Sequence, residues 1–174
     1  YDYLLQLPHK AALNMLTAGL AKKDVNQFKP HQTLSDLTVD SYPFYLDPMP
    51  STYFTRDHGA VVQDNLVLSS MLNAARKRET IFLRMLQKHH PLFQEQNLGV
   101  WFDEELPAGL EGGDLLVLGD RSICIGLSER TTEEAIEQAA HRLLVEKEAL
   151  DTVLVIQIPA RRSFMHLDTV FTMV

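Results

Sequence analysis

The feature that most constrains the fold is a pattern that the chain repeats. An Asp is followed by two short apolar segments around a turn, then by a helical segment and by a further apolar segment. The Asp residues are Asp57, Asp114 and Asp168, which are separated by 57 and 54 positions. A supersecondary unit repeated at such a period predicts an α/β protein built from strand–strand–helix–strand units.

The two complete units lie near residues 44–103 and 108–158. In the first, we expect two strands around a turn at Asp64 and Asn65, a helix over 73–89 and a strand at "LGVWFD". In the second, we expect a turn at Gly119 and Asp120 and a closing strand at "TVLVIQI". Its helix runs to about residue 150, and Thr131 with Glu134 forms a capping box at its start.

A third unit begins at "MHLDTVFTMV", over residues 163–174, and we expect a strand over 169–174. This strand has no hairpin mate after it, so we expect the chain to be a piece of a longer protein. Residues 1–40 precede the repeats. They include a predicted helix over 9–23, with Leu13, Leu16 and Leu20 at helical spacing, and we place a domain boundary near residue 40.

Composition excludes several classes of partner. The formal net charge is −7 without any basic block, which argues against binding to nucleic acid. No apolar run approaches the roughly 20 residues that a membrane helix needs. Cys124 is the single cysteine, and it lies among apolar residues in a predicted strand, where a small buried hydrophobe is expected. We expect a cytoplasmic protein without disulfides.

Carboxylates mark the start of each unit. If the units surround a common axis, the side chains of Asp57, Glu111, Asp114 and Asp168 converge, and buried carboxylates need cations or hydrogen bonds. A guanidinium group suits them because it is planar, always charged and rich in N–H donors. The alternative is that these acids are caps and turn formers, and that Asp57 pairs with its neighbour Arg56.

His166 and Asp168 are two positions apart, which places them on one face of the predicted strand. They could form an acid–base pair or contribute two metal ligands. One His and one Asp are a weak signal for zinc, which takes three or four ligands. A lone histidine is more often structural.

Four motifs together resemble the arginine deiminase family: "DPMPSTYFTRD", "LEGGDLLVLG", "IGLSERTT" and "MHLDTVFT", in that order. The resemblance runs from about Phe44 to the last residue. It implies a pentein-type α/β propeller, of which this chain holds a part, with the N-terminal helical segment as the end of an insertion. It also implies hydrolysis of L-arginine to L-citrulline and ammonia through a cysteine nucleophile, without metal or cofactor.

The resemblance further implies roles for individual residues. Asp57 and Asp168 would hold the substrate guanidinium, with Glu111 assisting the acid–base chemistry. His166 would be the general acid that protonates the leaving ammonia and then the base that activates water. The substrate-binding residues would be Asp57, Asp168, Arg130, Arg76 and Phe54, with Arg130 and Arg76 on the α-carboxylate.

Two positions depart from the family pattern: Ser51 stands where Asn is usual, and His58 stands where Pro is usual. The nucleophile of the family lies beyond "MHLD", and Cys124 belongs to a different motif, so residues 1–174 alone are expected to be inactive. The alternatives are a dimethylarginine hydrolase, an amidinotransferase or a non-catalytic binding module. We also expect a homo-oligomer.

Overall fold

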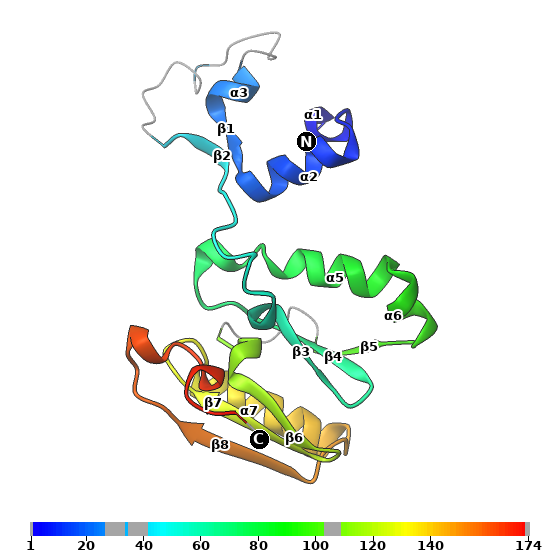
Figure 1. Cartoon of the computed structure of the whole chain (residues 1–174), viewed down its shortest axis with the longest axis vertical. Helices are drawn as coiled ribbons and strands as arrows, with labels where there is room; N and C mark the ends of the chain where they lie inside the picture. The colour runs from blue at the N-terminus through cyan, green and yellow to red at the C-terminus, as the bar shows by residue number, and fades with distance from the viewer. Residues whose placement is uncertain (1, 27–33, 35–41, 103–108, 173–174) are drawn as a thin grey trace. The chain divides into compact units, whose positions relative to one another are not determined.

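The computed structural model describes residues 2–26, 34, 42–102 and 109–172, and the statements below concern these residues. The chain divides into two compact units, Tyr1–Thr52 and Tyr53–Val174 (Figure 1). The boundary predicted near residue 40 lies outside the described residues. No described helix has the length and apolar character that crossing a membrane requires.

The first unit is small and mostly helical. Its elements are α1 (Asp2–Leu5), α2 (His9–Ala18), β1 (Leu20–Ala21), α3 (Lys22–Asn26) and β2 (Phe44–Leu46), and β1 pairs with β2 in antiparallel fashion. The helix predicted over 9–23 is too long. It ends at Gly19, whose φ of +86° is a left-handed conformation that breaks the helix and favours glycine.

The second unit begins with one strand–strand–helix–strand repeat. Its elements are β3 (Gly59–Val62), β4 (Asn65–Leu68), the short 3₁₀ helix η2 (Ala74–Arg76), α5 (Thr80–His89), α6 (Pro91–Glu95) and β5 (Gly99–Phe102). Strand β4 is central, antiparallel to β3 and parallel to β5. The predicted helix over 73–89 therefore begins later, after the separate turn η2.

The second repeat has the same topology. Its elements are β6 (Leu115–Gly119), β7 (Ser122–Leu127), α7 (Glu133–His141), which continues as the π-helical turn η4 (Arg142–Glu146), and β8 (Thr152–Gln157). Strand β7 is antiparallel to β6 and parallel to β8. The predicted α/β class and its repeating unit are therefore confirmed for two units, drawn in green and in yellow to orange in Figure 1.

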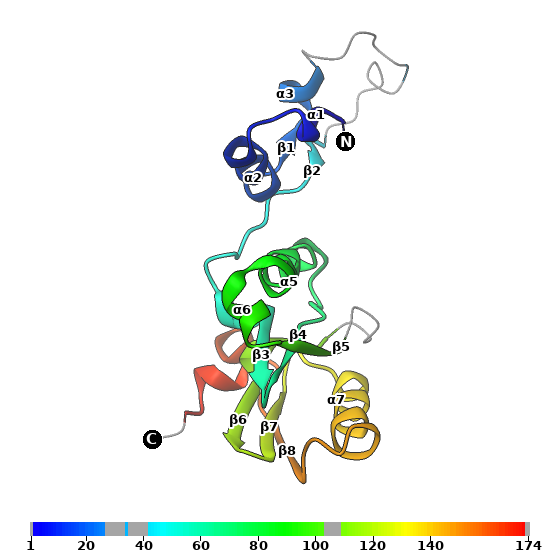
Figure 2. The same ribbon diagram turned by 90° about the vertical axis from the view of Figure 1, so that its right-hand side faces the viewer.

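Alternation along the central strands explains how the layers pack. In β7, Ile123 and Ile125 face the main core, which they share with Val67 of β4 and with apolar residues of α7. Cys124, between them, faces a second cluster with Leu167 and is fully buried. The structure thus confirms the prediction that Cys124 is a buried hydrophobe. The helix α7 packs against the sheet of β6, β7 and β8 (Figure 2).

The two repeats are joined at their turns. Gln63, in the β3–β4 turn, donates hydrogen bonds from Nε2 to the carbonyl oxygens of Asp120 and Ala149, both in the second repeat. Gln63 has a φ of +52°, so the turn that carries this link adopts a left-handed conformation. The link fixes the turn of one repeat onto the turns of the other.

Two local predictions were wrong. The side chain that caps α7 is that of Thr132, which accepts a hydrogen bond from the N–H of Ala135, because the Thr131 hydroxyl is committed elsewhere. The predicted strand over 169–174 is absent over its described part. Residues Leu167–Thr169 form a 3₁₀ turn, η6, and the N–H groups of Val170 and Phe171 both donate to the carbonyl of Leu167.

Candidate active site

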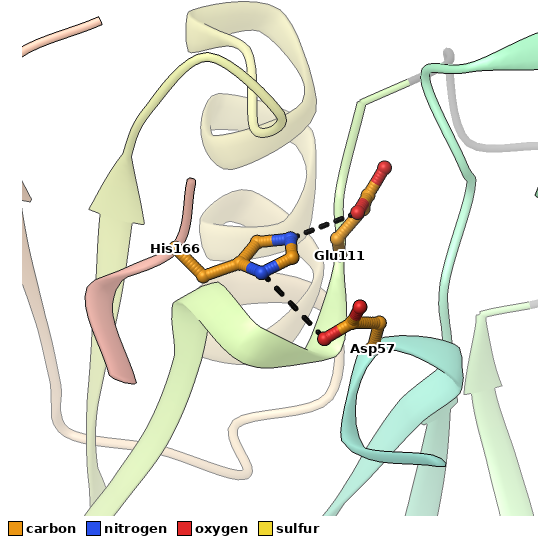
Figure 3. A group of neighbouring side chains, drawn as sticks. All are labelled: Asp57, Glu111 and His166. Atoms are coloured by element: carbon orange, nitrogen blue, oxygen red, sulfur yellow. Dashed lines mark hydrogen bonds and ion pairs between the residues drawn. The ribbon is translucent and has the colours of Figure 1, made fainter. Parts of the chain in front are cut away.

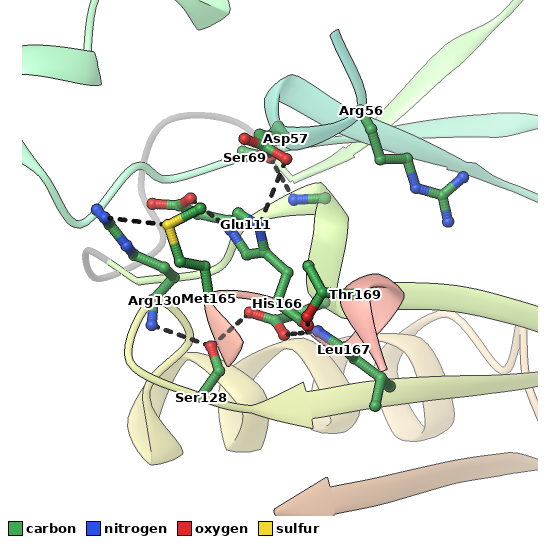
Figure 4. A network of polar contacts seen from close by, with 12 residues as sticks. Arg56, Asp57, Ser69, Glu111, Ser128, Arg130, Met165, His166, Leu167 and Thr169 are labelled. Atoms are coloured by element: carbon green, nitrogen blue, oxygen red, sulfur yellow. Dashed lines mark hydrogen bonds and ion pairs between the residues drawn. The ribbon is translucent and has the colours of Figure 1, made fainter. Parts of the chain in front are cut away.

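Each repeated Asp lies in a 3₁₀ turn. These turns are η1 (Thr55–His58), which precedes β3, η3 (Gly112–Asp114), which precedes β6, and η6. Turn η3 contacts both η1 and η6, so the starts of the units meet, as the repeat predicted. Sequence positions more than 50 residues apart thereby supply side chains to one site (Figure 4).

The two glycines of "EGGD" make this meeting possible. A Cβ atom on Gly112 would lie 2.3 Å from the carbonyl oxygen of Arg56, so η3 can pack against η1 only without a side chain there. A Cβ atom on Gly113 would lie 2.7 Å from the ring of His166. The two glycines therefore allow η3 to pack closely against the η1 backbone and the His166 ring.

His166 lies between two carboxylates (Figure 3). Its Nε2 atom is 2.8 Å from Oε2 of Glu111, and its Nδ1 atom is 3.5 Å from Oδ1 of Asp57. All three residues are buried. His166 has extended backbone and directly precedes η6, so it does not share a strand with Asp168 as predicted.

The surroundings of His166 favour its protonated form. Burial of the ring acts to lower the pKa of His166, but the hydrogen bond with Glu111 and the charges of Asp57 and Asp114 outweigh burial and raise the pKa. A histidine held in this way can donate a proton near neutral pH. The pair of Glu111 and His166 is thus suited to acid–base chemistry.

A guanidinium group already contacts these carboxylates. Nη1 of Arg76 lies 2.9 Å from Oδ2 of Asp57 and 3.6 Å from Oε2 of Glu111. Burial acts to lower the pKa of Arg76, and its hydrogen bonds to Asp57 and Glu79 raise it. Arg76 was predicted to bind a substrate carboxylate, and here it lies among carboxylates of the chain itself.

The contacts of Arg76 with Glu79, and of Glu79 with His58, were not predicted from the sequence. Glu79 is fully buried, and its Oε2 atom accepts a hydrogen bond from Nε of Arg76 at 2.9 Å. The same oxygen is 3.2 Å from Nε2 of His58, one of the two positions that depart from the family pattern. The i,i+3 spacing of Arg76 and Glu79 was the available signal.

Asp57 does not pair with Arg56. The Nη2 atom of Arg56 donates to the carbonyl oxygen of Leu115 at 3.1 Å, and the Arg56 side chain points away from the site in Figure 4. The alternative pairing considered from the sequence is therefore wrong. Asp57 faces Arg76 and His166 instead.

Asp168 and Phe54, also predicted to bind substrate, are both exposed. Asp168 is exposed, yet partial burial of its carboxyl group, with the charge of Asp57, raises its pKa, and His166 opposes this rise. It lines a cleft with Arg56, Leu115 and other residues. Phe54 is 57% exposed and stands edge-on to Tyr53.

Arg130 lies in the loop between β7 and α7. Its Nη2 atom is 3.9 Å from Sδ of Met165, the residue before His166. Its Nε atom is buried and has no hydrogen-bond acceptor among the described residues, and the same is true of Nη2 of Arg76. Both arginines that were predicted to bind a carboxylate therefore have a buried N–H group without an acceptor among the described residues.

Asp57, Glu111 and His166 also have the donor atoms of a metal site, since their ligand atoms lie within 4.8 Å of one another. The positive charge of Arg76 already compensates both carboxylates, those of Asp57 and Glu111. Cys124 is not part of the site. Burial raises the pKa of its thiol, which disfavours a thiolate.

The chain matches known proteins over nearly its whole length. The arginine deiminase family model matches residues 2–174. Arginine deiminases of Listeria welshimeri serovar 6b and of Bacillus cereus (strain ATCC 10987) are each 43% identical over 173 residues. In both cases the match covers 99% of this chain and 42% of the relative, so the chain spans less than half the length of these proteins.

Solved structures show the same fold. A mutant of DDAH from Pseudomonas aeruginosa, solved with citrulline, superposes with a TM-score of 0.51 at 22% identity, over 87% of this chain and 59% of that one. Unliganded AgrE superposes with a TM-score of 0.50 at 28% identity, over 70% of this chain and 16% of that one. The repeats, the three meeting turns and the match over nearly all residues lead to one conclusion: the chain belongs to the arginine deiminase family.

Proposed function

We propose that the whole protein to which these residues belong hydrolyses L-arginine to L-citrulline and ammonia. The observation that carries this proposal is that Asp57 and Glu111, beside His166, already hold a guanidinium group, that of Arg76. Because the carboxylates suit the geometry and charge of one guanidinium, they suit that of a substrate. Family membership supports the same reaction.

His166 is the proposed general acid and base. The raised pKa of His166 supports a protonated ring that donates to the departing ammonia, after which the neutral ring takes a proton from water. Glu111 holds Nε2 of the ring and is itself fixed through Oε1, which accepts a hydrogen bond from the N–H of Leu72 at 3.3 Å. The ring and the carboxylate therefore keep one relative orientation.

The two arginines are proposed to bind the amino-acid end of the substrate. The N–H groups of Arg76 and Arg130 that have no acceptor among the described residues support this role, because a buried donor without a partner favours binding of a carboxylate. Arg76 must then turn its Nη1 atom away from Asp57, or share that carboxylate with the substrate guanidinium. Asp168 and Phe54 are proposed to complete the guanidinium pocket from its margin.

The nucleophile is proposed to be a cysteine thiolate that the whole protein contributes from outside residues 1–174, because Cys124 is buried in a strand. The thiolate adds to the guanidinium carbon, and the C–N bond breaks as His166 protonates the leaving ammonia. Water then attacks the same carbon and gives one proton to His166. The C–S bond breaks to release the thiolate, and transfer of the second water proton to the released ammonia leaves neutral citrulline and ammonium. No atom changes its oxidation state in these steps.

The test uses a chain that carries these residues and spans the length of the curated relatives. Purified protein is incubated with L-arginine, and citrulline and ammonia are measured together. Equal amounts of both products are expected, and both are expected to be lost in a His166→Ala variant. Dimethylarginine and agmatine are assayed in parallel, and faster conversion of dimethylarginine than of arginine would refute the assigned substrate.

A cytoplasmic location and a homo-oligomeric state complete the proposal. The single cysteine of the chain, buried and unpaired, is compatible with a reducing compartment. Sedimentation of the whole protein at micromolar concentration is expected to show a species larger than one chain. A monomer at all concentrations would refute the oligomer.

A further inference from the structure

The buried carboxylate of Asp114 joins three segments that carry site residues. It is fully buried and accepts three hydrogen bonds, from Oγ of Ser128 at 2.6 Å, from Oγ1 of Thr131 at 2.7 Å and from the N–H of Leu167 at 2.7 Å. Ser128 and Thr131 lie in the loop of Arg130. Leu167 directly follows His166 (Figure 4). Asp114 therefore contacts both the Arg130 loop and the turn of His166.

The loop side of this network reaches Arg130 and Glu111. Oγ of Ser128 accepts hydrogen bonds from the N–H groups of Arg130 at 3.0 Å and Thr131 at 3.1 Å. Oγ1 of Thr131 accepts one from the N–H of Glu111 at 3.2 Å. Because both hydroxyls donate to Asp114, the orientation of each is fixed by that carboxylate.

We propose that Asp114 is a positioning residue that holds the Arg130 loop, the Glu111 backbone and the turn of His166 in one arrangement. This inference rests on the proposed function, because it assigns Arg130 to substrate capture and His166 to proton transfer. It goes further in making one buried carboxylate responsible for keeping the two ends of the substrate site at a fixed separation. A residue that only stabilised the turn η3 would not couple them.

Replacement of Asp114 by Asn tests the proposal without changing the size of the side chain. The hydroxyl of Ser128 already accepts two N–H groups, so it can offer only its proton to residue 114. An amide nitrogen at the position of Oδ2 would face that proton, and an amide nitrogen at the position of Oδ1 would face the N–H of Leu167. Either orientation of Asn leaves one donor opposite another, at a cost comparable to an unsatisfied buried group.

The experiment is run on a chain that spans the length of the relatives. Asp114→Asn is expected to raise KM for arginine and to lower kcat, each by at least about tenfold. The inhibition constant of agmatine, which has no carboxylate to meet Arg130, is expected to change by less than KM does. Asp120→Asn, in the exposed turn after β6, is the matched control and should leave all three values unchanged.

A second variant covers the case in which Asp114→Asn does not fold. Ser128→Ala removes the link from Asp114 to the N–H groups of Arg130 and Thr131 and leaves the Asp114 contacts with the Thr131 hydroxyl and Leu167 in place, so it is expected to raise KM for arginine several-fold with a smaller change in kcat. If Asp114→Asn folds, KM of the double variant Asp114→Asn/Ser128→Ala should not exceed that of Asp114→Asn alone. The reason is that both substitutions break the same link between residue 114 and the Arg130 loop. Additive losses, or unchanged KM in the folded single variants, would overturn the proposal.

Failure of the proposed function is recognised separately. If the unaltered protein does not convert arginine, the proton and nitrogen NMR signals of the His166 ring and of Arg130 Nε–H report the coupling directly. Asp114→Asn should shift both sets of signals and Asp120→Asn neither. Unshifted signals in Asp114→Asn would overturn the role of Asp114, whatever the reaction is.

Discussion

Oε2 of Glu111 lies 2.8 Å from Nε2 of His166, and both side chains are almost completely removed from water. A hydrogen bond of this kind is stronger inside the protein than at its surface, because the local dielectric is low. The carboxylate therefore controls two properties of the ring at once: its orientation and its protonation state.

Glu111→Gln should lower the pKa of His166. The hydrogen bond with Glu111 and the charges of Asp57, Asp114 and Glu111 raise the pKa of His166 against the effect of burial, and the variant removes both contributions of Glu111. Because the folded-state pKa of His166 is raised, its contribution to stability is present below the unfolded value of about 6.5 and is lost as pH rises through the folded value. An NMR titration of His166 measures the pKa directly.

The stability of the Glu111→Gln variant follows from the same shift. Relative to the unaltered chain, the free energy of unfolding should fall most near pH 5–6 and less at higher pH, where the ring is neutral in both. An unchanged pKa of His166 in the variant would contradict the assigned contact. Glu129→Gln, at an exposed position, is the control.

Asp57→Ala and Asp168→Ala should each reduce arginine turnover by at least about 100-fold in the whole protein. Asp57 holds a guanidinium at 2.9 Å in this structure, and a charge-assisted hydrogen bond of that kind contributes about 1.5–3 kcal/mol. Asp64→Ala, in the exposed β3–β4 turn, is the control. Near-normal turnover in both variants would refute the assignment of these carboxylates.

Gly113→Ala should displace the His166 ring. The added Cβ would lie 2.7–2.9 Å from three ring and side-chain atoms of His166, and relief of such overlap costs about 1–3 kcal/mol. We expect kcat to fall by about tenfold or more and the melting temperature to drop. Gly119→Ala is the matched control, since a Cβ there meets nothing within 4 Å. Equal effects of the two substitutions would show that the ring is not tightly held.

Arg130→Leu should weaken capture of the amino-acid end of the substrate. KM for arginine should rise, and discrimination against agmatine, which lacks the carboxylate, should be lost, because the buried Nε–H would no longer be available to an acceptor. Steady-state kinetics with both compounds measure this. Equal losses for arginine and agmatine would mean that Arg130 acts only on the structure of its loop.

Cys124→Ala should leave arginine turnover per folded molecule unchanged. Cys124 is fully buried in β7, and burial raises the pKa of its thiol, so it is not a thiolate within reach of substrate. The loss of one buried sulfur should cost about 1 kcal/mol or more of stability. Abolished turnover in a folded variant would reverse the view that the nucleophile lies elsewhere in the whole protein.

The repeat and the meeting of its carboxylates were predictable because hydrophobic periodicity and turn residues act locally. Strands β3, β4, β6 and β7 follow directly from short apolar runs on either side of a turn. The strand expected over 169–174 does not form over its described residues, and the reason is physical. The carbonyl of Leu167 accepts two N–H groups from the residues that follow it, which closes a turn where β-branched residues had suggested a strand.

The site was predictable in its residue types and less so in its pairings. Glu111 and His166 were both identified, but the sequence could not show that Arg76 reaches Asp57 or that Glu79 holds Arg76 from behind. Pairings of this kind depend on side-chain directions set by tertiary packing. The choice of Thr132 over Thr131 as helix cap has the same origin, since Asp114 in a distant turn takes the Thr131 hydroxyl.

The bond between Glu111 and His166 joins positions 55 residues apart in the chain. Contacts so distant in sequence form only after the entropy of closing the intervening loop has been overcome, which slows folding and places such contacts late in it. Asp57 and Glu111 likewise belong to different repeats, so a ligand that needs both carboxylates recognises only chains in which the two repeats have docked. A ligand of this kind should then bind only chains that have folded completely. Its binding should protect the backbone amides of both repeats from hydrogen exchange to the same extent.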